Sequence, residues 1–286
     1  MKRLWYVFLF IVLAGSTTYA QPEKSSLLWE VSGNGLQQPS WLFGTFHILC
    51  KEDFTISDIL KNKLQASKQF YGELDMDDPN LQMQIAMKMM MTDKTLESLM
   101  TEDDYKKVSG HFQQITGMSI KLFNNFKPFM PLSLLAINTI PCDNKIQPET
   151  EFTELAKKNN LPIFGLETVD DQINAIDKEP LYSQINEFKQ TVMNFDSVKQ
   201  VMSQLISVYK LRDVDSLYKF MKTAGANDSF EMDLIINRNR NWIPVIKKAL
   251  TEKPTFFAVG AGHLGGPNGV ISLLRKQGYR VTPVMY

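Results

Sequence analysis

Histidine and cysteine are scarce in this sequence, and the common catalytic motifs are absent. Among 286 residues there are three histidines and two cysteines. No HExxH, Gly-x-Ser-x-Gly or Walker motif is present, so the commoner hydrolase and nucleotide-binding interpretations lack support. Basic and acidic side chains both number 31, so no excess of positive charge indicates a nucleic-acid partner.

The first twenty residues have the pattern of a signal peptide. Lys2 and Arg3 precede a short apolar segment over residues 4–14, and Thr18-Tyr19-Ala20 offers small residues where a signal peptidase cleaves. An uncleaved membrane anchor is the alternative, but the segment is shorter than the roughly 20 residues that span a bilayer. We predict cleavage after Ala20, a periplasmic or secreted protein without a stable membrane span, and one domain over residues 21–286.

An exported protein has an oxidising environment in which its two cysteines can pair. A disulfide between Cys50 and Cys142 would close a long loop and stabilise the fold by roughly 4–5 kcal/mol in the chain-entropy model. Since Cys50 is three residues after His47, the bridge would also hold that histidine's segment. Two separate buried thiols, thiolate ligation of a metal, and a Cys-His catalytic pair are the alternatives.

Apolar runs and turn formers predict the fold class. Residues 27–32 and 40–48 are apolar and aromatic, and the turn formers at 33–39 between them predict a β-hairpin. Further strands are expected at 69–76, 161–168, 256–259 and 279–284, with helical spacing between them. The sequence therefore predicts an α/β protein with a central mixed β-sheet that begins with a hairpin and is surrounded by many helices.

Two of the three histidines occur in the same local pattern. Residues 40–49 and 255–264 each read as a buried strand that ends in Gly-x-x-His, which gives Gly44 with His47 and Gly260 with His263. This repetition is what a two-histidine metal site or acid–base site needs, whereas the alternative is two histidines that only satisfy strand ends. His111 lies in a different pattern, and we expect it to be structural or solvated.

Carboxylates follow two other predicted strands. Glu73 and Asp75 would share one face if their strand stays regular, and Gly72 would let a ligand approach the backbone. A solvated strand end is the alternative. Glu167 also stands at the carboxyl end of a strand, where ligands bind in open α/β sheets, but it can equally begin a helix whose dipole favours acids.

Two polar or flexible clusters have open interpretations. Arg238-Asn239-Arg240-Asn241 suggests contacts to an anion or carbonyl, although a solvated helix face explains it as well. The methionine cluster is more typical of core filling than of a substrate groove. Its members are Met83, Met87, Met89, Met90 and Met91.

Five segments in order resemble the TraB/GumN family over about residues 27–284. They are Gly44-Thr45-Phe46-His47, Glu73 after a strand, Gly165-Leu166-Glu167-Thr168, Arg238-Asn239 before Trp242, and Gly260-Ala261-Gly262-His263-Leu264-Gly265-Gly266. The resemblance implies a Tiki-like fold related to the erythromycin esterase and ChaN-like group, with a cleft formed by the paired Gly-x-x-His segments. In the Tiki branch, that pair and an acidic residue are associated with a metal-dependent peptidase that uses cobalt or manganese.

The leading hypothesis is an exported divalent-metal hydrolase that acts on peptides. His47, His263 and Glu73 would bind manganese, cobalt or zinc, with Glu73 as the third ligand or as the general base for water. Arg238 would stabilise an oxyanion, and Glu167 and Asn239 would support the ligands. Gly44 and Gly260 would let the backbone approach the bound molecule.

Two other functions stay open at this point. One is a periplasmic binding protein that captures haem, a metal or a small polar ligand without turnover. The other is hydrolysis without a metal, in which His47 or His263 acts as the general base. The sequence identifies neither the substrate nor the oligomeric state.

Overall fold

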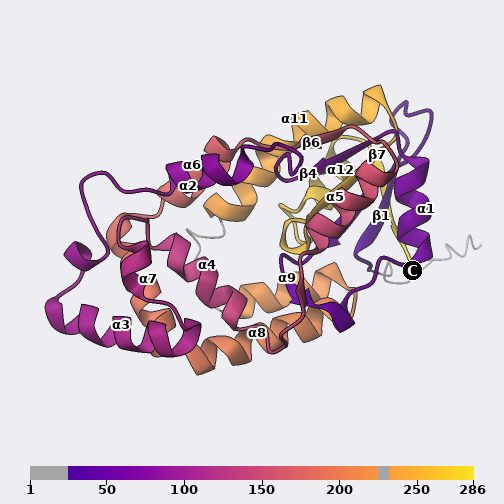
Figure 1. The fold of residues 1–286 in the computed structure, drawn as a ribbon. Helices are drawn as coiled ribbons and strands as arrows, with labels where there is room; N and C mark the ends of the chain where they lie inside the picture. Colours follow the sequence, from indigo (N-terminus) through magenta and orange to yellow (C-terminus); the bar gives the residue numbers. More distant parts are fainter. Residues whose placement is uncertain (1–24, 225–231) are drawn as a thin grey trace, which may run out of the picture.

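The computed structural model describes residues 25–224 and 232–286 (Figure 1). A six-stranded mixed sheet stands at one end of the molecule, in the order β6-β4-β7-β2-β1-β8. Helices cover the sheet and extend beyond it as a large helical region that contains α3, α4 and α7. The predicted fold class is confirmed.

The predicted hairpin forms the antiparallel part of the sheet. Strand β1 (Leu28–Ser32) pairs antiparallel with β2 (Ser40–Thr45), and with β8 (Arg280–Val284) on its other side. The remaining strands β4 (Gln69–Gly72), β6 (Ile163–Gly165) and β7 (Thr255–Gly260) run parallel to β2. Every residue of β2 and β7 is buried, which is why both read as continuous apolar runs in the sequence.

Eleven α-helices are present in the described residues. They are α1 (Asp58–Ala66), α2 (Leu81–Lys88), α3 (Glu102–Thr116), α4 (Phe129–Asn138), α5 (Pro148–Lys158), α6 (Val169–Asp177), α7 (Leu181–Met193), α8 (Phe195–Lys210), α9 (Val214–Thr223), α11 (Asn237–Glu252) and α12 (Val270–Lys276). The main hydrophobic core lies on the sheet, and a separate cluster that includes Phe112 and Phe188 joins α3, α4 and α7.

The parallel strands bring four chain segments to one edge of the sheet. Thr45 at the end of β2 pairs with Gly260 at the end of β7, and Gly72 of β4 pairs with Gly165 of β6. The carboxyl ends of these strands therefore point the same way. In open α/β sheets this edge is where ligands bind.

Two local predictions are wrong. Strand β4 ends at Gly72, so Glu73 and Asp75 do not share a strand face, and the Asp75 carboxylate instead accepts a hydrogen bond from the Asp77 amide at 3.0 Å. The methionine cluster is not uniformly core filler. Met89 is 2% exposed, whereas Met83, Met87 and Met90 are each about half exposed.

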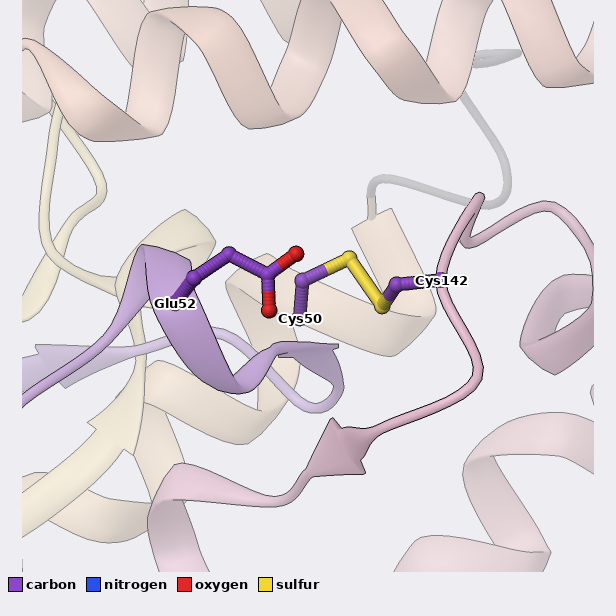
Figure 2. Close-up of side chains that lie close together, drawn as sticks. All are labelled: Cys50, Glu52 and Cys142. Carbon is purple, nitrogen blue, oxygen red and sulfur yellow. A yellow bond between two sulfur atoms is a disulfide. The ribbon is translucent and has the colours of Figure 1, made fainter.

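The predicted disulfide between Cys50 and Cys142 is confirmed. Figure 2 shows Glu52 beside the two sulfur atoms, but bonded sulfurs do not offer the thiolates that a metal site needs. Next to the bridge, β3 (Leu49–Cys50) pairs with β5 (Lys145–Ile146). The segment after His47 is therefore tied to the segment that leads into α5.

Export and domain organisation stay predictions. The predicted signal peptide lies outside the described residues. Within the described parts of the chain, no helix is both long and apolar enough to cross a bilayer.

Candidate active site

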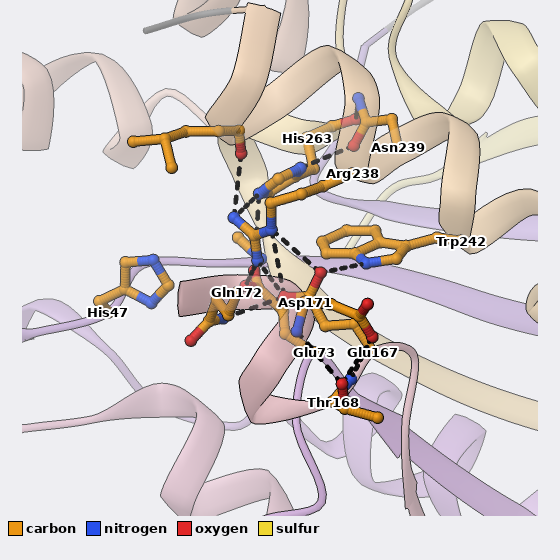
Figure 3. Close-up of polar contacts among 12 residues, drawn as sticks. His47, Glu73, Glu167, Thr168, Asp171, Gln172, Arg238, Asn239, Trp242 and His263 are labelled. Atoms are coloured by element: carbon orange, nitrogen blue, oxygen red, sulfur yellow. Dashed lines mark hydrogen bonds and ion pairs between the residues drawn. The ribbon is translucent and has the colours of Figure 1, made fainter. Parts of the chain in front are cut away.

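Polar side chains that are far apart in sequence meet where the parallel strands end (Figure 3). Glu73 follows β4, Glu167 follows β6, and His263 follows β7 in the short 3₁₀ turn η5 (Ala261–His263). Helix α11 contributes Arg238 from its first turn. The structure thus brings together most of the residues that the sequence selects, and all four of these side chains are largely buried.

Arg238 joins the two carboxylates. Its Nη2 donates to Glu73 Oε2 at 2.6 Å and to Glu167 Oε1 at 2.6 Å, and its Nε lies 3.1 Å from both Glu167 oxygens. A planar guanidinium suits such paired contacts because its donors are fixed in one plane. The three side chains therefore form a buried charged group with one net negative formal charge.

Glu167 is fully engaged inside this group. Its oxygens also accept from Trp242 Nε1 at 2.9 Å and from Gln172 Nε2 at 3.0 Å. The helix that follows has its own capping box, formed by Thr168 and Asp171. Glu167 is thus an anchor for Arg238 and Trp242 and is not needed as a helix-start acid.

His263 is held on two sides. Its Nδ1 lies 2.6 Å from Asn239 Oδ1, and the Asn239 amide nitrogen donates to the carbonyl oxygens of His263 and Asn268. Since Oδ1 must therefore accept, His263 carries its proton on Nδ1 and presents the lone pair of Nε2. The ring also packs on Trp242, with 4.4 Å between ring centroids.

Burial and nearby charges set the protonation states of His263 and Glu73. Burial, reinforced by the charge of Arg238, lowers the pKa of His263 to about 3 against the attraction of Glu73. Burial alone would raise the pKa of Glu73, but its electrostatic interactions with His263, Arg238 and His47, in decreasing order, and the Gly260 N–H at 2.8 Å lower this pKa to about 2. At neutral pH the site holds an ionised Glu73 and a neutral imidazole at His263.

His47 is placed differently, to one side of this cluster (Figure 3). Its side chain is 75% exposed, and Nδ1 lies 3.0 Å from Glu149 Oε1. The Thr45 hydroxyl donates to the same oxygen at 2.7 Å. The hydrogen bond and the charge of Glu149 raise the pKa of His47 to about 9, so in the metal-free chain this imidazole carries a proton on both ring nitrogens at neutral pH.

The two motif glycines have different surroundings. A Cβ atom on Gly260 would lie 3.1 Å from Glu73 Oε1, 3.5 Å from His263 Cδ2 and 3.7 Å from His47 Cε1. Gly260 thus lies where the three predicted ligands converge. A Cβ on Gly44 would instead lie 2.9 Å from both Ala261 Cβ and Leu264 Cδ1, so the missing side chain of Gly44 makes room for packing.

The residues fit a divalent ion by chemistry. Two imidazoles and a carboxylate are a donor set known from catalytic zinc sites. Glu73, Glu149 and Glu167 bring three negative formal charges, and Arg238 and protonated His47 bring two positive ones, so the metal-free site has one net negative charge. When an ion displaces the His47 proton the site has two, which a divalent ion would balance. The donors are not gathered as tightly as in a formed site, because no choice of one ligand atom from each of His47, Glu73 and His263 brings all three within 4.8 Å of one another.

A pocket of about 210 Å³ opens beside these groups. His47, Glu73 and Glu149 contribute to its wall, and Phe70 and Leu74 give it an apolar part. His47, Glu73 and Glu149 therefore face a space that a small ligand or one side chain can enter, whereas Arg238 and His263 are not part of its wall.

Comparison with known proteins identifies the family of this chain. A sequence model of the TraB/PrgY/gumN family matches residues 27–283. The chain belongs to this family. The matched range includes every residue of the site described above.

Curated relatives of this TraB/PrgY/gumN protein include Metalloprotease TIKI2 of Danio rerio, 23% identical over 318 aligned residues, and Metalloprotease TIKI1 of Homo sapiens, 25% identical over 318. The alignments cover 92% and 91% of this chain but 61% and 62% of the relatives. The chain thus spans about three fifths of their length. No solved structure matches the chain with significance.

In this TraB/PrgY/gumN chain, the structure places some of the residues selected from the sequence in the site, leaves others outside it, and adds one residue. In the run at the start of α11, Arg238 and Asn239 face the site, while Arg240 and Asn241 are exposed. His111 is exposed on α3, as expected. Sequence reasoning missed Glu149, whose only local signal is its place in the acidic first turn of α5.

Proposed function

We propose that this chain is an exported, divalent-metal-dependent hydrolase that acts on peptides. The observation that carries the proposal is the convergence of Glu73, His47 and His263 around Gly260. Each histidine has its Nδ1 occupied by a side-chain oxygen, which is the usual arrangement of histidines that bind metals and leaves Nε2 as the nitrogen for an ion. In the metal-free chain Nε2 of His263 lies 3.3 Å from Arg238 Nη1. The names of the metalloprotease relatives support the peptide substrate class.

The ligands in this proposal are His47, Glu73 and His263, and the ion is manganese, cobalt or zinc. When bound, such an ion supplies Lewis-acid chemistry, which polarises a peptide carbonyl and lowers the pKa of a water molecule. A low pKa at Glu73 keeps a carboxylate available at neutral pH, and neutral His263 offers a lone pair without losing a proton. Glu73 is in place either to hold the ion or to accept a proton from water.

Arg238 brings a positive charge to the same edge of the site. Its Nη1 lies 3.3 Å from His263 Nε2 and donates to the Leu234 carbonyl at 3.0 Å. A guanidinium fixed by two carboxylates costs little to reorganise, so it is suited to stabilise negative charge on a substrate oxygen. Glu167 and Asn239 act by holding Arg238 and His263 in place.

The size of the pocket favours a peptide side chain over a large cofactor. Pockets for drug-sized ligands hold roughly 300–1,000 Å³, whereas this one holds about 210 Å³. A haem is at least as large as such ligands, so haem capture gains no support from the described residues. A binding function without turnover, for a metal or a small polar ligand, predicts ligand binding without any cleavage.

The test is peptide cleavage by the purified chain from residue 21 onward. A peptide library is incubated with the metal-free chain and with the chain supplied with manganese, cobalt or zinc. We expect cleavage that requires an ion, stops with a chelator, and falls at least a hundredfold in His47→Ala and in His263→Ala. His111→Ala is the matched control, since His111 is exposed on α3, and it should cleave normally. Metal-stimulated cleavage that survives both site substitutions contradicts the proposal.

A further inference from the structure

We propose that Glu149 is the positioning residue of His47, and that it fixes the imidazole so that Nε2 is the nitrogen offered to the site. This inference rests on the proposed function, because it assigns Glu149 a task within the same site. Glu149 lies on α5, and the side chains that its carboxylate contacts are those of Thr45 and His47.

The contrast between the two histidines shows why His47 needs such a residue. His263 has a side chain only 5% exposed and a ring packed on Trp242, so surrounding atoms restrict it. The His47 side chain is 75% exposed, so packing does little to restrict its ring. The contact of Nδ1 with Glu149 Oε1 at 3.0 Å is the polar contact that selects one orientation.

Glu149 is itself well fixed. Its side chain is 17% exposed, and the buried Thr45 donates its hydroxyl to Oε1 at 2.7 Å. The same oxygen therefore accepts from the last residue of β2 and contacts the histidine two residues later. The β3–β5 pairing and the disulfide join the segment after His47 to the segment before α5. Carboxylate and imidazole are thus held at one spacing by backbone on both sides.

The contact with Glu149 gives the two ring nitrogens of His47 different roles. A carboxylate can only accept at neutral pH, so Nδ1 must carry a proton in this contact. The second nitrogen, Nε2, is then the one that an ion would bind, by displacing the proton that Nε2 carries at neutral pH in the metal-free chain. Outer residues of this kind typically contribute 10- to 100-fold to metal affinity or activity.

The first experiment measures the His47 ring in the metal-free chain and needs no activity. Carbon-13 relaxation of the ring C–H groups at a fixed pH reports their motion on the picosecond to nanosecond timescale. We expect an ordered ring in the wild type and a mobile ring in Glu149→Ala. Glu151→Ala is the matched control, because Glu151 also lies in the first turn of α5 and is exposed. An equally ordered ring in Glu149→Ala overturns the proposal.

A second variant covers the case in which Glu149→Ala loses stability. Glu149→Asp keeps the negative charge at the start of α5, where it favours the helix dipole, but withdraws the carboxylate by one methylene. The ring of His47 should again become mobile while the signals of His263 stay unchanged. A His47 ring that stays as ordered as in the wild type overturns the proposal.

The second experiment titrates manganese or cobalt into the same proteins by calorimetry. We expect affinity to fall 10- to 100-fold in Glu149→Ala and to stay unchanged in Glu151→Ala. Equal affinity in the two variants overturns the proposal. If the wild type binds no ion and cleaves no peptide, the proposed function fails, whereas the ring measurement still decides whether Glu149 positions His47.

Discussion

Replacing each motif glycine by alanine should damage two different properties of the protein. At Gly44 the new methyl group would lie 2.9 Å from Ala261 Cβ and from Leu264 Cδ1, inside the packed contact between β2 and η5. Overpacking of this kind costs about 1–3 kcal/mol. Since alanine also restricts the unfolded chain by about 0.4–1 kcal/mol, the net loss of stability for Gly44→Ala should be about 1–2 kcal/mol.

At Gly260 the methyl group would meet the site itself. Its nearest neighbours are Glu73 Oε1 at 3.1 Å and the rings of His263 and His47 at 3.5 and 3.7 Å. The backbone there has φ −50° and ψ 131°, which alanine adopts without strain. We expect Gly260→Ala to change stability by less than about 1 kcal/mol and to weaken metal binding at least tenfold, because the methyl group occupies the space between the ligands.

Urea denaturation and metal titration of both variants test this reasoning. Each variant serves as the control for the other, since the substitution is the same and both positions precede a histidine by three residues. A Gly260→Ala protein that binds metal and cleaves peptides like the wild type refutes the proposed location of the site. A Gly44→Ala protein of undiminished stability refutes the packing argument.

Three further predictions concern the supporting structure. Glu167→Gln should lower the free energy of unfolding by about 3 kcal/mol. This is the lower end of the range for breaking a buried ion pair, because Arg238 keeps its contact with the Glu73 carboxylate. Urea denaturation measures the loss, and a value below about 1 kcal/mol contradicts the prediction. Reducing the Cys50–Cys142 bridge, whose sequence separation is 92, should cost roughly 4–5 kcal/mol in the same assay. Unchanged stability in reductant contradicts this expectation. Burial lowers the pKa of His263 from 6.5 to about 3, so below pH 6.5 the unfolded chain binds a proton at this residue and the folded chain does not. The free energy of unfolding should therefore fall by about 2 kcal/mol between pH 6 and pH 4.5, and the same dependence of stability on pH in His263→Asn contradicts this assignment.

The fold and the paired motifs could be predicted because their signals are local. Strands β2 and β7 are buried on both faces, so their central residues are apolar and each run stops at Gly-x-x-His. The turn formers between β1 and β2 predict their hairpin equally well. These features depend on neighbouring residues, which a single sequence displays.

Acidic residues near helix starts show where local signals fail. Glu149 and Glu167 both stand close to the start of a helix, where any acid is favoured by the dipole. Only long-range contacts distinguish their tasks: Glu149 meets His47 across 102 residues, and Glu167 meets Arg238 across 71. The exposure of Met83 and Met87 likewise depends on which elements pack beside α2. The sequence of α2 alone does not determine these neighbours.

Metal binding by the purified metal-free chain tests the central claim most directly. Calorimetric titration with manganese, cobalt and zinc should show one ion bound per chain. Affinity should fall at least tenfold in each of His47→Ala, Glu73→Gln and His263→Ala, and stay unchanged in His111→Ala. Binding of one ion with wild-type affinity in the three site variants, or no binding by the wild type, would contradict the assignment of these residues as ligands.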